Sequence, residues 1–188
     1  MDGKDHDKKG ENIMVTTIDY CFRNNKVVSF YFDKEDNQVH LTGLIQCYNE
    51  NEILISHISP RGEYDGFILK KIDDLYRIDY DGEYEKKIQQ LYELKNQSHS
   101  VIKCSEDGIL YPLLNFADDN NYMMSFELQN DKITGLINEY NDFIYVSTIN
   151  DNGFNSGITV IDIDEVITFS CDTDYEQDLS FLYRERKQ

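Results

Sequence analysis

An internal repeat constrains this chain more than any single motif. The stretch LTGLIQCYN, which begins at Leu41, returns 92 residues later as ITGLINEYN, which begins at Ile133. Three blocks align without gaps, and about a third of their residues are identical: 41–49 with 133–141, 53–92 with 144–183, and 13–30 with 109–126. Because similarity at a fixed spacing marks repeated structural units, the chain contains two copies of one unit.

The repeat divides the 188 residues into five segments. We predict a disordered tail at 1–12, a first unit with a closing helix at 13–95, a linker at 96–108, a second unit with a closing helix at 109–183, and a tail at 184–188. Units of this size have marginal cores by themselves, so we expect the two units to pack together.

Each unit shows the pattern of a helix, five strands and a second helix. Apolar residues spaced three and four apart predict the opening helix, and alternating apolar residues predict the strands. In the first unit the strands are expected at 27–32, at 39–47, at 52–58, at about 64–71 and at about 75–80. The fold class is therefore mainly β with short helices.

A closing helix follows the fifth strand of each unit. Tyr84, Ile88 and Tyr92 fall on one helical face, and the second unit repeats this pattern. Asp81 and Asp172 precede the two helices, and we expect them to cap the helix N-termini.

Two features of the strands are repeated in both units. Gly43 and Gly135 lack a side chain at equivalent points of the second strand, which predicts a sharp bend or bulge there. Asp73 and Asp164 each begin an acidic doublet in the tight link before the fifth strand. Such a doublet could do acid–base chemistry, but adjacent residues seldom converge, so a structural role in the turn is favoured.

This order of elements resembles the Sm-like and SH3-like small barrels. The resemblance implies tandem five-stranded barrels, each with flanking helices, and Sm-like barrels bind RNA. The run from Ser56 to Lys95 is also similar to an uncharacterised family of bacterial proteins without an assigned activity.

Negative charge is concentrated in the second half of the chain. Residues 105–183 contain sixteen Asp or Glu and one Lys, whereas residues 13–95 contain fifteen acidic and ten basic residues. The whole chain has a net charge of −18, which repels the phosphates of nucleic acids. The acidity suits a basic protein partner, and solubility alone also explains it.

The cysteines and the hydropathy bear on location. Cys21, Cys47, Cys104 and Cys171 show no C-x-x-C spacing and are not repeated between the units. We therefore expect free thiols and a cytoplasmic protein. The longest apolar runs are too short to span a membrane, and no targeting segment is evident.

Motifs of known chemistry are absent from the sequence. His6, His40, His57 and His99 belong to no metal-ligand pattern, so no metal site is predicted. Phosphate-binding loops and serine-nucleophile motifs are also missing, and no cofactor is expected. We therefore do not expect an enzyme; the acidic doublets are the only basis for one.

The leading hypothesis is a non-catalytic binding or regulatory module that acts through protein contacts. Exposed tyrosine suits binding surfaces. The alternative is RNA binding, for which Arg61, Lys70, Lys71 and Arg77 would supply a small basic patch. The candidate binding residues are Tyr48, Arg61, Tyr64, Glu127, Glu139, Tyr140, Asp142, Tyr145 and Asp178.

Overall fold

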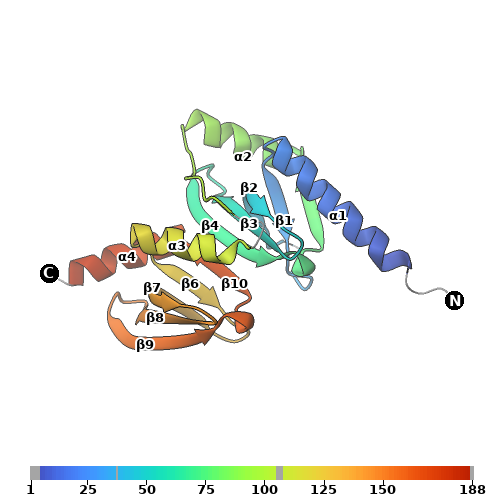
Figure 1. The fold of residues 1–188 in the computed structure, drawn as a ribbon. Helices are drawn as coiled ribbons and strands as arrows, with labels where there is room; N and C mark the ends of the chain where they lie inside the picture. The colour runs from blue at the N-terminus through green and yellow to red at the C-terminus, as the bar shows by residue number, and fades with distance from the viewer. Residues whose placement is uncertain (1–4, 37, 105–107, 187–188) are drawn as a thin grey trace.

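The computed structural model describes residues 5–36, 38–104 and 108–186, which form ten strands and four α-helices (Figure 1). The first unit contains α1 (Asp5–Arg23), β1 (Val28–Tyr31), β2 (Leu41–Tyr48), β3 (Glu52–Ile58), β4 (Tyr64–Lys71), the 3₁₀ turn η1 (Ile72–Asp74), β5 (Arg77–Tyr80) and α2 (Glu83–Leu94). The second unit contains α3 (Leu110–Asn120), β6 (Met124–Glu127), β7 (Lys132–Tyr140), β8 (Phe143–Ile149), β9 (Asn155–Asp162), η2 (Ile163–Glu165), β10 (Thr168–Cys171) and α4 (Asp174–Arg186). The predicted order of elements is confirmed in both units.

All ten strands belong to one open antiparallel sheet, in the order β5-β1-β2-β3-β4-β10-β6-β7-β8-β9. In each unit the first strand pairs with both the second and the fifth. The mainly β class is confirmed. Closed tandem barrels are not, because within the described residues β4 pairs with β3 and β10, and β5 pairs only with β1.

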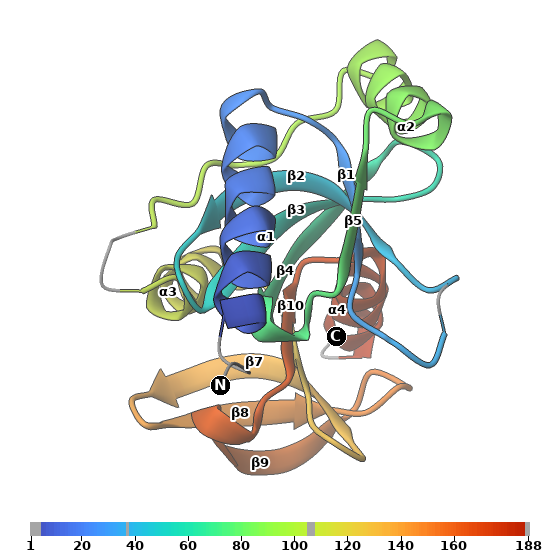
Figure 2. The ribbon, with the colours of Figure 1, turned by 90° about the vertical axis from the view of Figure 1, so that its right-hand side faces the viewer.

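The pairing of β4 with β10 joins the two units. Phe67 lies opposite Cys171, and Leu69 lies opposite Phe169. All four side chains are buried, at most 6% exposed. On its other side β10 pairs with β6, so both edges of β10 are hydrogen-bonded. The expectation that the two units pack together is therefore met by a shared sheet (Figure 2).

The helices cover separate parts of the sheet. α1 packs through Ile18 and Cys21 onto the core of the first unit. α3 lies at the junction, where Leu113 and Ala117 belong to the same buried cluster as Phe67. α3 thus shields strands of both units, and the largest buried cluster contains residues of both.

The ends of the chain differ from the prediction. α1 begins at Asp5, inside the predicted disordered tail, so its helix includes residues 5–12. α4 continues to Arg186, into the predicted C-terminal tail. Residues 1–4 and 187–188 lie outside the described residues.

Gly43 and Gly135 are required by a close approach of two strands. A Cβ at Gly43 would lie 2.2 Å from the carbonyl oxygen of Ser56, and a Cβ at Gly135 would lie 2.1 Å from that of Ser147. A bulge is present in each strand but follows the glycine, at the register shifts after Ile45 and Ile137. The predicted bulge is confirmed, and its placement at the glycine is corrected.

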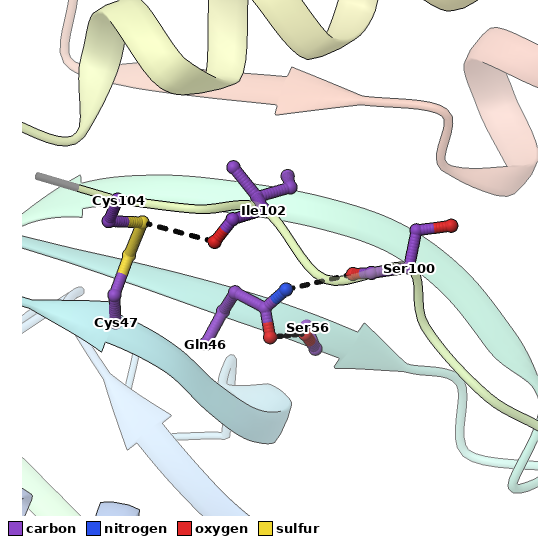
Figure 3. Close-up of a disulfide and its surroundings, with 6 residues drawn as sticks. All are labelled: Gln46, Cys47, Ser56, Ser100, Ile102 and Cys104. Atoms are coloured by element: carbon purple, nitrogen blue, oxygen red, sulfur yellow. Dashed lines mark hydrogen bonds between the residues drawn. A yellow bond between two sulfur atoms is a disulfide. The ribbon is translucent and has the colours of Figure 1, made fainter.

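Two of the four cysteines form a disulfide. Cys47 on β2 is bonded to Cys104 in the connection between α2 and α3, with 6.5 Å between their Cα atoms (Figure 3). Beside it, the Gln46 side-chain amide donates a hydrogen bond of 2.8 Å to the Ser100 carbonyl. The prediction of four free thiols is therefore wrong for this pair. The expectation of a cytoplasmic protein loses that support, because disulfides persist in oxidising compartments.

The remaining cysteines agree with the prediction. Cys21 and Cys171 are free and buried. Burial raises the pKa of Cys21 to about 11, so this thiol is protonated at neutral pH.

Replacing Gly43 or Gly135 with Val should destabilise the protein by about 3 kcal/mol, because the new Cβ forces β2 from β3 or β7 from β8. Urea unfolding measures the change, and Glu139→Val, at an exposed site of β7, is the control. A loss below about 1 kcal/mol, as an ordinary change of conformational propensity would cause, would contradict the close approach.

Removing the disulfide with Cys47→Ser and Cys104→Ser should lower the free energy of unfolding by up to about 4 kcal/mol, since the bond closes a loop across 57 residues. Reductant should destabilise the wild-type protein equally and leave the double variant unaffected. Alkylation of the denatured, unreduced protein should modify two thiols; four modified thiols would refute the bond.

Candidate functional site

The candidate site is a groove of about 910 Å³ at the junction of the two units, which we call the junction groove. Strands β1 to β4 supply one side, and β6, β7, β10 and the start of α4 supply the other. Its polar lining includes His57, Asp65, Lys70, Glu127 and Lys132. The groove depends on the contact of β10 with β4, which lie side by side in Figure 2.

His57 and Asp65 lie in contact on the first unit's side of the groove. Nδ1 of His57 lies 3.0 Å from Oδ2 of Asp65, although the two groups are poorly aligned for a hydrogen bond. A β-bulge between Ser56 and Ile58 places His57 there, since bulges redirect side chains. The sequence pattern around His57 gives no signal for this contact, because Asp65 lies on the neighbouring strand.

Asp65 also reaches the second unit. Its carboxylate accepts a 2.7 Å hydrogen bond from the backbone amide of Asp174, at the start of α4. Burial favours a raised pKa, but the contacts with His57 and the Asp174 amide outweigh it and lower the pKa of Asp65. The carboxylate is thus ionised and fixed between the units.

Lys70 crosses the junction from β4. Its Nζ donates a 2.8 Å hydrogen bond to the Thr168 hydroxyl and lies 5.1 Å from the ring centre of Phe32. Burial lowers the pKa of Lys70, while the nearby Glu127 carboxylate partly opposes this shift.

A buried carboxylate organises the hydroxyl groups of the second unit. Glu176 is 1% exposed, and it accepts hydrogen bonds from Ser125, from Ser170 at 3.1 Å, and from both the amide (2.9 Å) and the hydroxyl of Thr173. Thr173, rather than the predicted Asp172, therefore precedes α4 in a capping-box arrangement. Lys132 offsets the charge, with Nζ 4.0 Å from Oε1 of Glu176.

The first unit repeats the centre of this network. Ser29 on β1 donates a 2.6 Å hydrogen bond to Glu85, which is 6% exposed. The sequence held a signal for these pairs, because both the serine and the glutamate are identical in the two units.

Two of the predicted binding tyrosines hold helices instead. Tyr48 donates a 2.6 Å hydrogen bond to Asp19 of α1, and burial together with this bond raises its pKa to about 12. The hydroxyl of Tyr140 donates to Asn115 of α3, and burial raises its pKa too.

The remaining tyrosines and Arg61 are scattered. Tyr64 lies at the junction, where its hydroxyl donates a 2.7 Å hydrogen bond to Asp172; burial, followed by this carboxylate, raises its pKa. Tyr145 lies half-buried on β8 opposite Val160. Arg61 is exposed and pairs with Glu63 at 3.0 Å.

The acidic candidates do not form one site. Glu127 ends β6 opposite Lys132, whereas Glu139 lies seven residues along β7, roughly 25 Å away by strand geometry. Asp142 occupies the turn after β7, and Asp178 is exposed on α4. Only Glu127 lines the junction groove.

The acidic doublets lie in the 3₁₀ turns. Asp73 is exposed in η1, and Asp164 occupies the equivalent place in η2, where its amide donates a 3.1 Å hydrogen bond to Asp162. Both aspartates thus belong to the predicted tight link. Asp74, the second member of the first doublet, lines the groove.

Across the described ranges there is no group of three or more His, Cys, Asp or Glu residues placed to hold a metal ion. Of the helices within these ranges, none combines the length and apolar character needed to cross a membrane.

Comparison with known proteins adds little. No family model matches the chain, and no curated protein matches it. Two structures of K. pneumonia MrkH, one in its apo state, align over 95% of this chain and 97% and 95% of their own, at 10% identity. Their TM-scores are 0.22 and 0.20, which support no argument about fold or function.

His99, expected in the linker, lies among the rings of Tyr64, Phe67 and Tyr92. Its Nδ1 accepts from the Tyr92 hydroxyl at 2.7 Å, which leaves Nε2 to donate to the carbonyls of His57 (2.8 Å) and Gly66. Burial lowers its pKa to about 4, so the imidazole is neutral in the folded protein.

His99 should make the protein less stable as the pH falls from about 6.5 to 4, because the unfolded chain binds a proton there that the folded chain does not. The loss should reach about 3 kcal/mol. Urea unfolding across this range tests it, with His99→Gln as the control that lacks this component. Equal slopes in both proteins would contradict a neutral, buried His99.

Proposed function

We propose that the protein is a non-catalytic binding module that holds a segment of a protein partner in the junction groove. The supporting observation is that this groove combines exposed apolar side chains with charges of both signs. Val39 is 56% exposed and Ile167 is 38% exposed, and Lys70 lies close to acidic Glu127 and Asp74. A peptide can match such a mixture, since protein interfaces combine apolar contacts with a polar rim.

The hydroxyl groups of the groove support a non-catalytic role. Ser125, Ser170 and Thr173 all donate to Glu176, and the Thr168 hydroxyl accepts from Lys70. A nucleophile requires a base that takes its proton. His57 contacts Asp65 and no hydroxyl group. Glu176 is shared among three hydroxyl groups and the Thr173 amide at the start of α4, which favours a structural role for this carboxylate over that of a base for one nucleophile.

RNA binding remains the alternative proposal. Arg61 and Arg77 are each paired with an acidic neighbour, Glu63 and Asp79. Arg61 also precedes β4, whereas Lys70 lies near its far end, so these cations do not form the continuous track that a phosphate backbone needs. A basic partner for the acidic second unit stays part of the proposal.

The small-barrel resemblance also remains a proposal, as does the cytoplasmic location. Each unit retains the helix, five strands and closing helix of such barrels, with the first strand paired to both the second and the fifth.

Selecting a random peptide library and a random RNA library against the immobilised protein should test the groove. We expect peptides whose binding weakens at least about tenfold in the Val39→Asp and Ile167→Asp variants, because a carboxylate is placed against their apolar side chains. Val101→Asp, at a valine that is 78% exposed outside the groove, is the matched control. The proposal would be contradicted if the selected peptides bound both groove variants as tightly as the wild type, or if only RNA were selected.

A further inference from the structure

The outer edge of β9 is apolar and open. β9 forms one end of the strand order and β5 forms the other. Ile158 is 69% exposed and Val160 is 50% exposed. Tyr145 of β8 lies opposite Val160 on the same face. A sheet edge of this kind is a template for pairing with another strand.

The equivalent residues of the first unit are buried. At the offset of 91, Ile158 corresponds to Phe67 and Val160 to Leu69, which are 0% and 1% exposed. β10 pairs with their strand, and Phe116 of α3 lies 5.4 Å from Phe67 between ring centres. The same strand of the repeat is thus covered in one unit and open in the other.

A repeated glycine points to the position of the covering strand. A Cβ at Gly66 would lie 2.3 Å from the carbonyl oxygen of Cys171, because β10 passes close to β4 there. Gly157 is the equivalent residue, and a Cβ built on it would meet nothing within 4 Å. Both glycines have positive φ, which by itself favours glycine. The space beside Gly157 is where a strand equivalent to β10 would pass.

The first unit carries the surface that matches this edge. β5 is the equivalent of β10, and its Tyr80 is 40% exposed where Cys171 is fully buried. α1 is the equivalent of α3, and its Tyr20, the counterpart of Phe116, is 44% exposed. The rings of Tyr20 and Tyr80 lie 5.7 Å apart, so they form one patch.

We propose that the edge of β9 binds the free edge of β5 from a second copy of this chain, repeating between molecules the β4–β10 contact within one. In the same register, Tyr80 of the second copy lies opposite Ile158, and Ile78 lies opposite Val160. The Tyr20 ring then covers Ile158, as Phe116 covers Phe67. The two surfaces differ, so the contact is head-to-tail and builds chains or rings.

Charge favours this pairing over that of two β9 edges. Two β9 edges would bring together two acidic second units, each with sixteen acidic residues and one lysine. Pairing β9 with β5 brings the second unit against the first, whose ten basic residues offset part of its fifteen acidic ones, so the repulsion between the units is smaller.

Two variants test the β9 edge and the β5 edge independently. The β9 variant is Ile158→Glu with Val160→Glu, and the β5 variant is Tyr80→Glu; all three side chains are at least 40% exposed, so the fold should survive. Circular dichroism and thermal melting check this. Leu94→Glu, at a residue that is 70% exposed on α2, is the matched control.

Sedimentation measures the mass of the full chain between about 1 and 100 µM, the range in which weak interfaces of modest size associate. The mass of the wild type and of Leu94→Glu should at least double over this range. Each edge variant alone should remain a monomer. An equimolar mixture of the two should form dimers and nothing larger, because one intact β9 edge and one intact β5 edge remain.

Three results would overturn the proposal. A wild-type chain that stays monomeric has no such contact. A β5 variant that still dimerises while the β9 variant does not would show pairing of two β9 edges. Association that survives in both variants would place the interface elsewhere.

Discussion

The pairing of β4 with β10 is the interaction on which the rest of the structure depends. It buries Phe67 and Leu69 of the first unit against the second, and it gives β10 a partner on both sides. Side-chain contacts that cross it include Lys70 with Thr168 and Tyr64 with Asp172. A marginal unit becomes stable by completing its sheet with a strand from its neighbour, and the junction groove is a product of the same contact.

The element order could be predicted from the sequence because local patterns determine it. Alternating apolar residues indicate which face of a strand is buried, and the repeat located all ten strands. Local patterns do not determine which strand lies beside which in the sheet. Residues 75–80 and 166–171 have equivalent patterns, yet β5 is a free edge and β10 is enclosed. Pairing between units depends on long-range packing, which a period of two does not encode.

The groove was harder to foresee for the same reason. His57 and Asp65 belong to neighbouring strands and meet only because a bulge turns His57. Cys47 and Cys104 have no counterparts in the repeat, so nothing in the pattern indicated their bond. Glu176 is the one groove-side residue that the sequence could have indicated, because an identical glutamate and an identical serine recur in both units.

The long separation of β4 from β10 has a consequence for synthesis on the ribosome. β4 ends at Lys71, and its partner begins at Thr168, nearly one hundred residues later. At about 5–20 residues per second, the apolar edge of β4 waits roughly 5–20 seconds for its partner. During that time the nascent first unit exposes Phe67 and Leu69 to other nascent chains. Slow translation of this stretch should therefore favour aggregation, and a chaperone that shields strand edges should relieve it.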